Sequence, residues 1–301
     1  MDTNELLRKV RRIEIKTRGL SQDVFAGAYH SAFKGRGMTF AEVREYQYGD
    51  DVRDINWNVT ARHGKPYVKI YEEERELTLM LLVDVSASRN FGAVGETKKE
   101  MMAEIAATLA FSSLQNKDKV GVIFFSDKVE KYIPPKKGLS HVLLIIREII
   151  NLEPRDPGTD ISAALRFLNT VVKKRSVAFL LSDFIDSHPW LDPMRIAARK
   201  HDLAAIQVYD RRDAQMPDVG LVRLRDMETG QTRWADTSSK RVRTAYNQLW
   251  YRRQQQLRAD AIACGLDVAT ISTDEDFVRQ LLALFHRRTA RRHRNVQTHH
   301  T

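Results

Sequence analysis

The pattern of hydrophobic and polar positions changes its period repeatedly from about residue 77 onward. Short, almost wholly apolar runs such as LTLMLLVDV at 77–85 have the length and composition of strands that are buried on both faces of a parallel sheet. Longer runs such as TKKEMMAEIAATLAFSSLQ at 97–115 repeat apolar residues at helical spacing. Strands that alternate with helices are typical of βαβ units, so the pattern predicts an α/β fold with a doubly wound, mostly parallel sheet.

The same two criteria place the other elements of this region. Further strands are expected at 119–126, 176–184, 203–210 and 266–273. Further helices are expected at 140–150, 160–172, 191–200, 240–263 and 274–288.

Two regions depart from this alternation. Residues 219–236 have the pattern of a β-hairpin that turns at 228–230 and is inserted before the long helix. The first 75 residues alternate short polar and apolar stretches with scattered glycines, which indicates a small β-rich lobe with a leading helix. We therefore expect three parts: the N-terminal lobe at 1–75, the α/β domain at 76–289 and a basic disordered tail at 290–301.

Composition narrows the class of protein. The 301 residues are 43% hydrophobic and 29% charged, which is typical of a globular chain. No apolar run approaches the roughly 18 residues that span a bilayer, and the start MDTNELLRKVRR lacks the apolar stretch of a signal peptide. We therefore expect a cytoplasmic protein without a membrane span. A single cysteine, Cys264, excludes an internal disulfide and a cysteine metal cage.

The C-terminal end is strongly basic. The run HRRTARRHR at 286–294 carries five arginines, against a net charge of +10 for the whole chain. Basic clusters attract polyanions, so nucleic-acid binding through this tail is one alternative function, and it would depend steeply on salt. A solvated chain end is the simpler interpretation.

Oxygen-bearing side chains gather where the predicted strands end and a predicted helix begins. Ligands of open α/β sheets bind outside the carboxyl ends of the strands, so these side chains are expected at one edge of the sheet. The set comprises three residues after the strand at 77–83, one before the helix at 160–172 and one at the end of the strand at 176–184: Asp84, Ser86, Ser88, Thr159 and Asp183.

Carboxylate and hydroxyl oxygens, without histidine or cysteine, suit a hard cation such as Mg²⁺ or Mn²⁺. If the hydroxyls bind the cation directly while the carboxylates act partly through water, the cation stays electrophilic and can accept an acidic side chain from another molecule. The alternative is that Asp84 and Asp183 cap loops and that the hydroxyls satisfy backbone groups.

The motif Asp84-x-Ser86-x-Ser88, with Thr159 and Asp183, resembles the metal-ion-dependent adhesion site (MIDAS) of von Willebrand factor A domains. The segments at 35–76 and 224–237 resemble the bacterial family catalogued as domain of unknown function 58. This resemblance extends from about 16 to 289. One departure is Asn56 before Trp57, where the family often has aspartate; it affects no expected metal ligand.

The resemblance implies a von Willebrand factor A or Rossmann-like fold and a protein that is not an enzyme. It further implies a partner of MoxR-type AAA+ ATPases, which accompany von Willebrand A proteins in many bacteria and assist the maturation of other proteins. On this view the chain is an adaptor or co-chaperone that recognises an acidic residue of the ATPase or of a client through Mg²⁺.

An enzymatic alternative is a phosphatase of the haloacid dehalogenase type, in which the aspartate after the first strand attacks phosphate. That chemistry needs a second carboxylate two residues later, and Ser86 occupies this position. Near the same edge, Trp190 and Pro193 are candidates for contact with a partner, although helix packing is the simpler interpretation.

Overall fold

The structure is a computed structural model that divides the chain into two compact units, Met1–Ala32 with Thr78–Thr301 and Phe33–Leu77. It describes residues 8, 11–17, 24–33, 39–72, 76–90, 97–154, 156–225 and 230–297.

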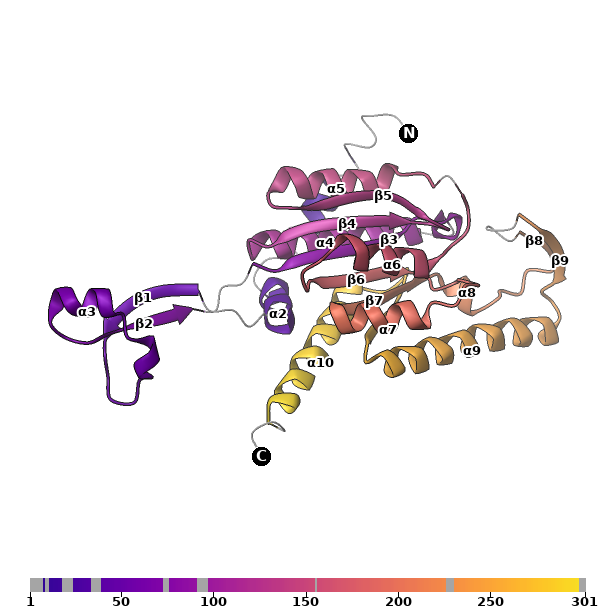
Figure 1. The fold of residues 1–301 in the computed structure, drawn as a ribbon. Coiled ribbons are helices and arrows are strands. Elements are labelled where there is room, and N and C mark those ends of the chain that lie inside the picture. Colours follow the sequence, from indigo (N-terminus) through magenta and orange to yellow (C-terminus); the bar gives the residue numbers. More distant parts are fainter. Residues whose placement is uncertain are drawn as a thin grey trace. The chain divides into compact units, whose positions relative to one another are not determined.

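The larger unit is built on a sheet of six strands in the order β10-β7-β6-β3-β4-β5 (Figure 1). All neighbouring pairs are parallel except β4 with β5, which is antiparallel. The strands are β3 (Thr78–Asp84), β4 (Lys119–Phe125), β5 (Val129–Lys136), β6 (Val177–Ser182), β7 (Asp202–Tyr209) and β10 (Asp267–Ser272). The predicted α/β class with a mostly parallel sheet is confirmed.

Helices cover both faces of this sheet. On one face, side chains of α6, α7 and α9 share a hydrophobic core with alternate residues of β3 and β6, including Leu82 and Leu180. On the other face, Phe179 of β6 packs against Phe285 of α10, with ring centroids 6.4 Å apart. The helices are α2 (Val24–Phe33), α4 (Lys98–Gln115), α5 (Leu139–Asn151), α6 (Ile161–Val171), α7 (Leu191–Lys200), α8 (Arg211–Ala214), α9 (Lys240–Cys264) and α10 (Phe277–Gln297).

The sequence pattern missed strand β5. Its sequence, VEKYIPPK, contains two prolines, which lack the N–H group that a central strand would need. The strand lies at the end of the sheet, where prolines are tolerated. Strands β4 and β5 lie so close together at Gly121 of β4 that a Cβ at this position would be 2.9 Å from the backbone nitrogen of Pro135.

The predicted hairpin insertion is confirmed. Strands β8 (Leu221–Arg225) and β9 (Thr232–Asp236) pair antiparallel, with Leu221 opposite Asp236. Of the expected turn, Gly230 has a left-handed φ of 69°, whereas 228–229 lie outside the described residues.

Helix α10 continues through the beginning of the expected disordered tail. It runs to Gln297, past the start of the tail expected at 290–301, and 298–301 lie outside the described residues. Arg288 pairs with Asp202 of β7 and with Asp267 of β10. Arg291 lies 3.8 Å from Asp267 and donates to the carbonyl of Gly265, at the end of α9, over 3.2 Å. These contacts explain why a basic segment is held as a helix.

The two N-terminal helical segments belong to the larger unit, whereas the sequence assigned them to the lobe at 1–75. Phe25 of α2 stacks edge-on against Phe285, with centroids 5.1 Å apart. Tyr29 lies within hydrogen-bond distance of Ser113 in α4, at 3.3 Å, and Lys16 pairs with Glu104. Burial of these aromatic rings accounts for the assignment.

The smaller unit contains an antiparallel ribbon of β1 (Thr39–Glu45) and β2 (Tyr67–Glu72). Between these strands lie the short 3-10 helix η1 (Val52–Asp54) and helix α3 (Trp57–His63). Arg44 holds the loop after β1 through two hydrogen bonds to the carboxylate of Asp50, at 2.8 and 2.7 Å.

Among the helices of the described residues, none is both long and apolar enough to cross a membrane.

Candidate metal-binding site at the sheet edge

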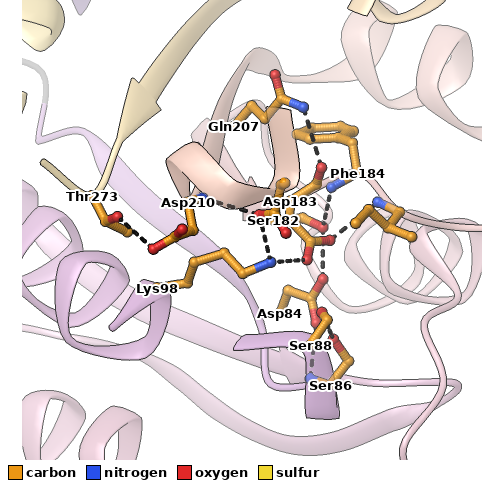
Figure 2. A network of polar contacts seen from close by, with 12 residues as sticks. Asp84, Ser86, Ser88, Lys98, Ser182, Asp183, Phe184, Gln207, Asp210 and Thr273 are labelled. Atoms are coloured by element: carbon orange, nitrogen blue, oxygen red, sulfur yellow. Dashed lines mark hydrogen bonds and ion pairs between the residues drawn. The ribbon is translucent and has the colours of Figure 1, made fainter. Parts of the chain in front are cut away.

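The site begins where the parallel strands β3 and β6 end side by side. Val83 is paired with Leu181, so the next residues, Asp84 and Ser182, come together. The Ser182 hydroxyl donates to Asp84 Oδ2 over 2.6 Å (Figure 2). Strand direction alone therefore brings residues that are 98 positions apart in the sequence into contact.

The serine pair lies in the turn that follows β3. The backbone N–H of Ser86 donates to Asp84 Oδ1 over 2.9 Å, and the hydroxyl oxygens of Ser86 and Ser88 are 3.0 Å apart. Arg89, in the 3-10 helix η2 (Ala87–Asn90), anchors this turn by donating to the carbonyls of Ile149 and Leu152. Both Asp84 oxygens are thus fixed, and two neutral hydroxyls lie beside them.

Thr159 reaches the same edge through its loop. The N–H of Ala87 donates to the Pro157 carbonyl over 3.1 Å, which joins this loop to the serine turn. The N–H of Asp160 donates to Ser126, after β4, over 2.7 Å, and the Asp160 carboxylate caps α6 by accepting from Ala163. Thr159 directly precedes this cap and is 2% exposed.

Asp183 follows β6 in a constrained turn. Its Oδ1 accepts from the N–H of Ile185 over 3.1 Å, and its carbonyl accepts from the side chain of Gln207 over 3.2 Å. The next residue, Phe184, has a φ of 58°, which is unusual for a bulky residue and marks local strain. The five residues predicted from the sequence therefore all lie at one edge of the sheet, with Asp84 at the end of β3 and the others in the turns and loops beside it.

Two buried carboxylates at this edge raise the cost of ionisation. The pKa of Asp84 is raised to about 6, mainly by burial and to a smaller extent by the negative charge of Asp183. Hydrogen bonds from Ser182 and Ser86 oppose this shift in the pKa. A cation placed among these oxygens would favour the ionised carboxylate, so the donor set fits a hard divalent ion.

Lys98 belongs to the polar network around Asp183, although the sequence pattern did not predict it (Figure 2). Its ammonium lies 2.8 Å from Asp183 Oδ2 and 3.1 Å from Asp213 Oδ2, and its side chain is 1% exposed. Burial lowers the pKa of Lys98, but the two carboxylates outweigh burial and hold that pKa above its usual range. Lys98 therefore supplies one fixed positive charge beside the predicted metal ligand Asp183.

A signal for Lys98 exists in the sequence. Helix α4 starts at this residue because Thr97 forms a capping box, accepting from the N–H of Glu100 over 3.2 Å. Lys98 precedes Met101 and Met102 by three and four positions, on the buried stripe of the helix. A lysine on such a stripe must find a buried anion.

A second group of potential ligands serves the local fold. Asp160, Asp186 and His188 each place a ligand atom within 4.8 Å of the others. Asp186 Oδ2 accepts from the N–H of Ile161 over 2.8 Å, and Oδ1 accepts from the N–H of His188 over 2.7 Å. These hydrogen bonds stabilise the turns around the site.

The fold and this cluster define a doubly wound α/β protein with an all-oxygen set of side chains at the carboxyl edge of its sheet. The chain belongs to the family described as protein of unknown function DUF58, whose model matches residues 42–256. Its sequence is 30% identical over 288 residues to that of the uncharacterized protein Mb1516 of Mycobacterium bovis. The aligned region covers 94% of this chain and 89% of the relative.

Similar solved structures include BatB, a conserved hypothetical protein from Bacteroides thetaiotaomicron. The similarity to BatB covers 71% of this chain and 99% of that one, with a TM-score of 0.47 and 14% identity. Proximal thread matrix protein 1 from the mussel byssus, in a structure with a zinc-occupied MIDAS motif, is similar over 45% of this chain and 38% of its own. Its TM-score is 0.36 and its identity 19%.

Proposed function

We propose that this protein is a non-enzymatic, metal-dependent protein-binding module. The residues that would hold a divalent cation, Mg²⁺ or Mn²⁺, are Asp84, Ser86, Ser88, Thr159 and Asp183. The observation that carries the proposal is the burial of all five at one sheet edge, with the two serine hydroxyls 3.0 Å apart beside an aspartate whose pKa is raised.

When bound, the cation supplies a Lewis acid that can accept a carboxylate from outside the chain. The residues of the chain prepare this position. Ser182 and the Ser86 N–H orient the Asp84 carboxylate, so its lone pairs point in fixed directions. Lys98 balances one negative charge at Asp183, which leaves more of the positive charge of the cation available to an incoming acid.

The partner on this proposal is a MoxR-type AAA+ ATPase, or a client protein that offers an acidic residue. Membership of the DUF58 family supports this choice through the association that the sequence resemblance implies. The protein would then act in the cytoplasm as an adaptor or co-chaperone during the maturation of other proteins.

Mn²⁺ binding followed by electron paramagnetic resonance tests the site directly. Saturable binding of one ion is expected in the wild type and a loss of at least about tenfold in affinity in Ser86→Ala, since a direct ligand is removed. Ser113→Ala is the matched control, because Ser113 is also fully buried but contacts Tyr29 instead. Equal Mn²⁺ affinity in all three proteins would refute the proposed ligand set.

A pull-down then tests the function. Wild type in Mg²⁺, wild type in EDTA, and Ser86→Ala in Mg²⁺ are compared on native cytosol, with bound proteins identified by mass spectrometry. Capture of an AAA+ ATPase or its client only by wild type in Mg²⁺ is expected. Capture of the same proteins in all three conditions would show that the site does not mediate recognition.

A further inference from the structure

The helical segment at 11–17 contacts the rest of the larger unit through one face. Ile13 is 7% exposed, and Thr17, four positions later on the same face, is fully buried. The Thr17 hydroxyl donates to the carbonyl of Ile13 over 2.6 Å, so it is satisfied within the segment. Lys16 pairs with Glu104 of α4 and holds the segment against that helix. The opposite face of the segment is therefore left at the surface.

The surface side of this segment carries four positive charges. Arg8, which is also helical, and Arg11, Arg12, Ile15 and Lys16 are exposed and line one surface depression. Spacings of three, four, seven and eight residues from Arg8 place these side chains on the same side of a helix. Among the described residues, no acid lines this depression. We call these five residues the basic face.

The arginines of the basic face lack acidic partners in the described part of the protein. Arg8, Arg11 and Arg12 form no ion pair with any residue that the structure describes. The one acid within 11–17, Glu14, is half-buried and borders the basic face beside Arg11. Three guanidinium groups can therefore pair with anions from outside the chain.

Ile15 adds an apolar contact among these charges. It is 68% exposed, three positions after Arg12 and four after Arg11. Burial of this side chain against a partner would be favourable, so the basic face fits a partner that has an apolar region next to its anions. The aliphatic stems of the arginines extend the apolar surface, because arginine can bury its stem while its guanidinium group stays at a polar boundary.

The surface of a membrane that contains anionic phospholipids has both properties. Its headgroups supply phosphates and carboxylates for the guanidinium groups, and the boundary of the acyl chains lies directly beneath them. A nucleic-acid backbone also supplies phosphates, but it would leave Ile15 against sugar and phosphate. The exposed isoleucine therefore favours the membrane surface over nucleic acid.

We propose that the basic face binds the surface of a membrane that contains anionic phospholipids. The helical segment would lie flat on the headgroups, with Ile15 toward the acyl chains and the arginines and Lys16 beside it. No residue of the predicted metal site takes part in this contact. The inference is therefore independent of the proposed function.

The test is cosedimentation of the full-length protein with sucrose-loaded vesicles in EDTA. The vesicles contain phosphatidylcholine alone or phosphatidylcholine with about 30% phosphatidylserine. Binding is expected only to the vesicles with phosphatidylserine and is expected to weaken at high salt. The affinity is expected to fall at least about 25-fold in Arg8→Glu/Arg12→Glu, about fivefold for each arginine. It is expected to fall about fivefold in Ile15→Gln, since apolar burial is lost.

Arg252→Glu/Arg258→Glu is the matched control, because both arginines are exposed on α9 and the double variant undergoes the same change of net charge. Circular dichroism verifies that each variant is folded. An equal loss of vesicle binding in this control would show that only the overall charge attracts the protein, and would overturn the inference. Absence of binding to the phosphatidylserine vesicles would also overturn it.

A nucleic-acid arm tests the competing polyanion. Binding of a labelled DNA duplex is followed by fluorescence anisotropy with the same variants. DNA binding that is lost in Arg8→Glu/Arg12→Glu, together with vesicle binding that is unchanged in Ile15→Gln, would overturn the assignment to a membrane. Vesicle binding that depends on both arginines and on Ile15, without DNA binding through them, supports it.

Discussion

Replacement of Lys98 by methionine is expected to lower the free energy of unfolding by about 3–5 kcal/mol in EDTA, the usual cost of leaving a buried charge without its partner. The ammonium lies 2.8 Å from Asp183 and 3.1 Å from Asp213. At an effective dielectric constant of about 20, each attraction is worth about 5–6 kcal/mol, and burial of the ammonium offsets several kcal/mol of this. Methionine keeps the length of the aliphatic stem, so the change mainly removes charge.

Lys99→Met is the matched control in the same helical turn. Lys99 pairs with Glu153 at 3.1 Å, but that glutamate is 69% exposed, and pairs with exposed members contribute about 0–1 kcal/mol. Urea denaturation followed by circular dichroism measures both variants. Addition of Mg²⁺ is expected to restore part of the stability of Lys98→Met, because the ion replaces positive charge near Asp183.

In EDTA, a free energy of unfolding of Lys98→Met within about 1 kcal/mol of the wild-type value, which is the contribution of an exposed ion pair, would refute this prediction. That result would mean that the two carboxylates do not depend on Lys98 for their stability in the folded protein.

Three further predictions follow from buried groups. In the folded protein the pKa of Asp84 is about 6, against about 3.9 for an ordinary aspartate. The stability that protonated Asp84 contributes is therefore complete below about pH 4 and is lost as the pH rises through 6. Urea titrations in EDTA are expected to show this loss in wild type but not in Asp84→Asn. His201 shows the opposite pH dependence, because burial lowers its pKa to about 4. The stability that it contributes is present above about pH 6.5 and is lost as the pH falls through 4. The melting temperature of His201→Asn is therefore expected to change less than that of wild type over this pH range. Gly121→Ala is expected to lower the free energy of unfolding by about 1–3 kcal/mol, since the new Cβ would lie 2.9 Å from the backbone of β5. Gly27→Ala, with no atom within 4 Å of the new Cβ, is expected not to destabilise the protein, and urea denaturation distinguishes the two variants.

The fold was predictable because its signals are local. Strands such as β6, with all six residues buried, produce a continuous apolar run that no surface segment imitates. Strand β5 was missed because its stability comes from pairing with β4, while its own sequence contains two prolines. Helix α10 extends past the predicted end at 288, where Arg291 donates to the carbonyl of Gly265, a contact that the local pattern does not reveal.

The positions of the five expected site residues were predictable for a related reason. In a parallel sheet all carboxyl ends lie on one edge, so Asp84 and Asp183 are brought together by chain direction without any knowledge of the contacts. Lys98 and Asp213 could not be placed in this way. Neither residue ends a predicted strand. Lys98 and Asp183 are 85 positions apart in the sequence, and only the packing of α4 on the sheet brings them together.

Asp183 belongs to the predicted ligand set and also lines a groove of about 480 Å³ between the loop after β6 and α9. Asp213 lines the groove as well, and Lys98 contacts both carboxylates. An acidic peptide that entered near these aspartates alone would meet repulsion, since like charges at short range disfavour each other. Lys98 and a bound divalent ion would together offset the negative charges of Asp84, Asp183 and Asp213, so recognition of an acid at this edge would require both the metal and the buried lysine.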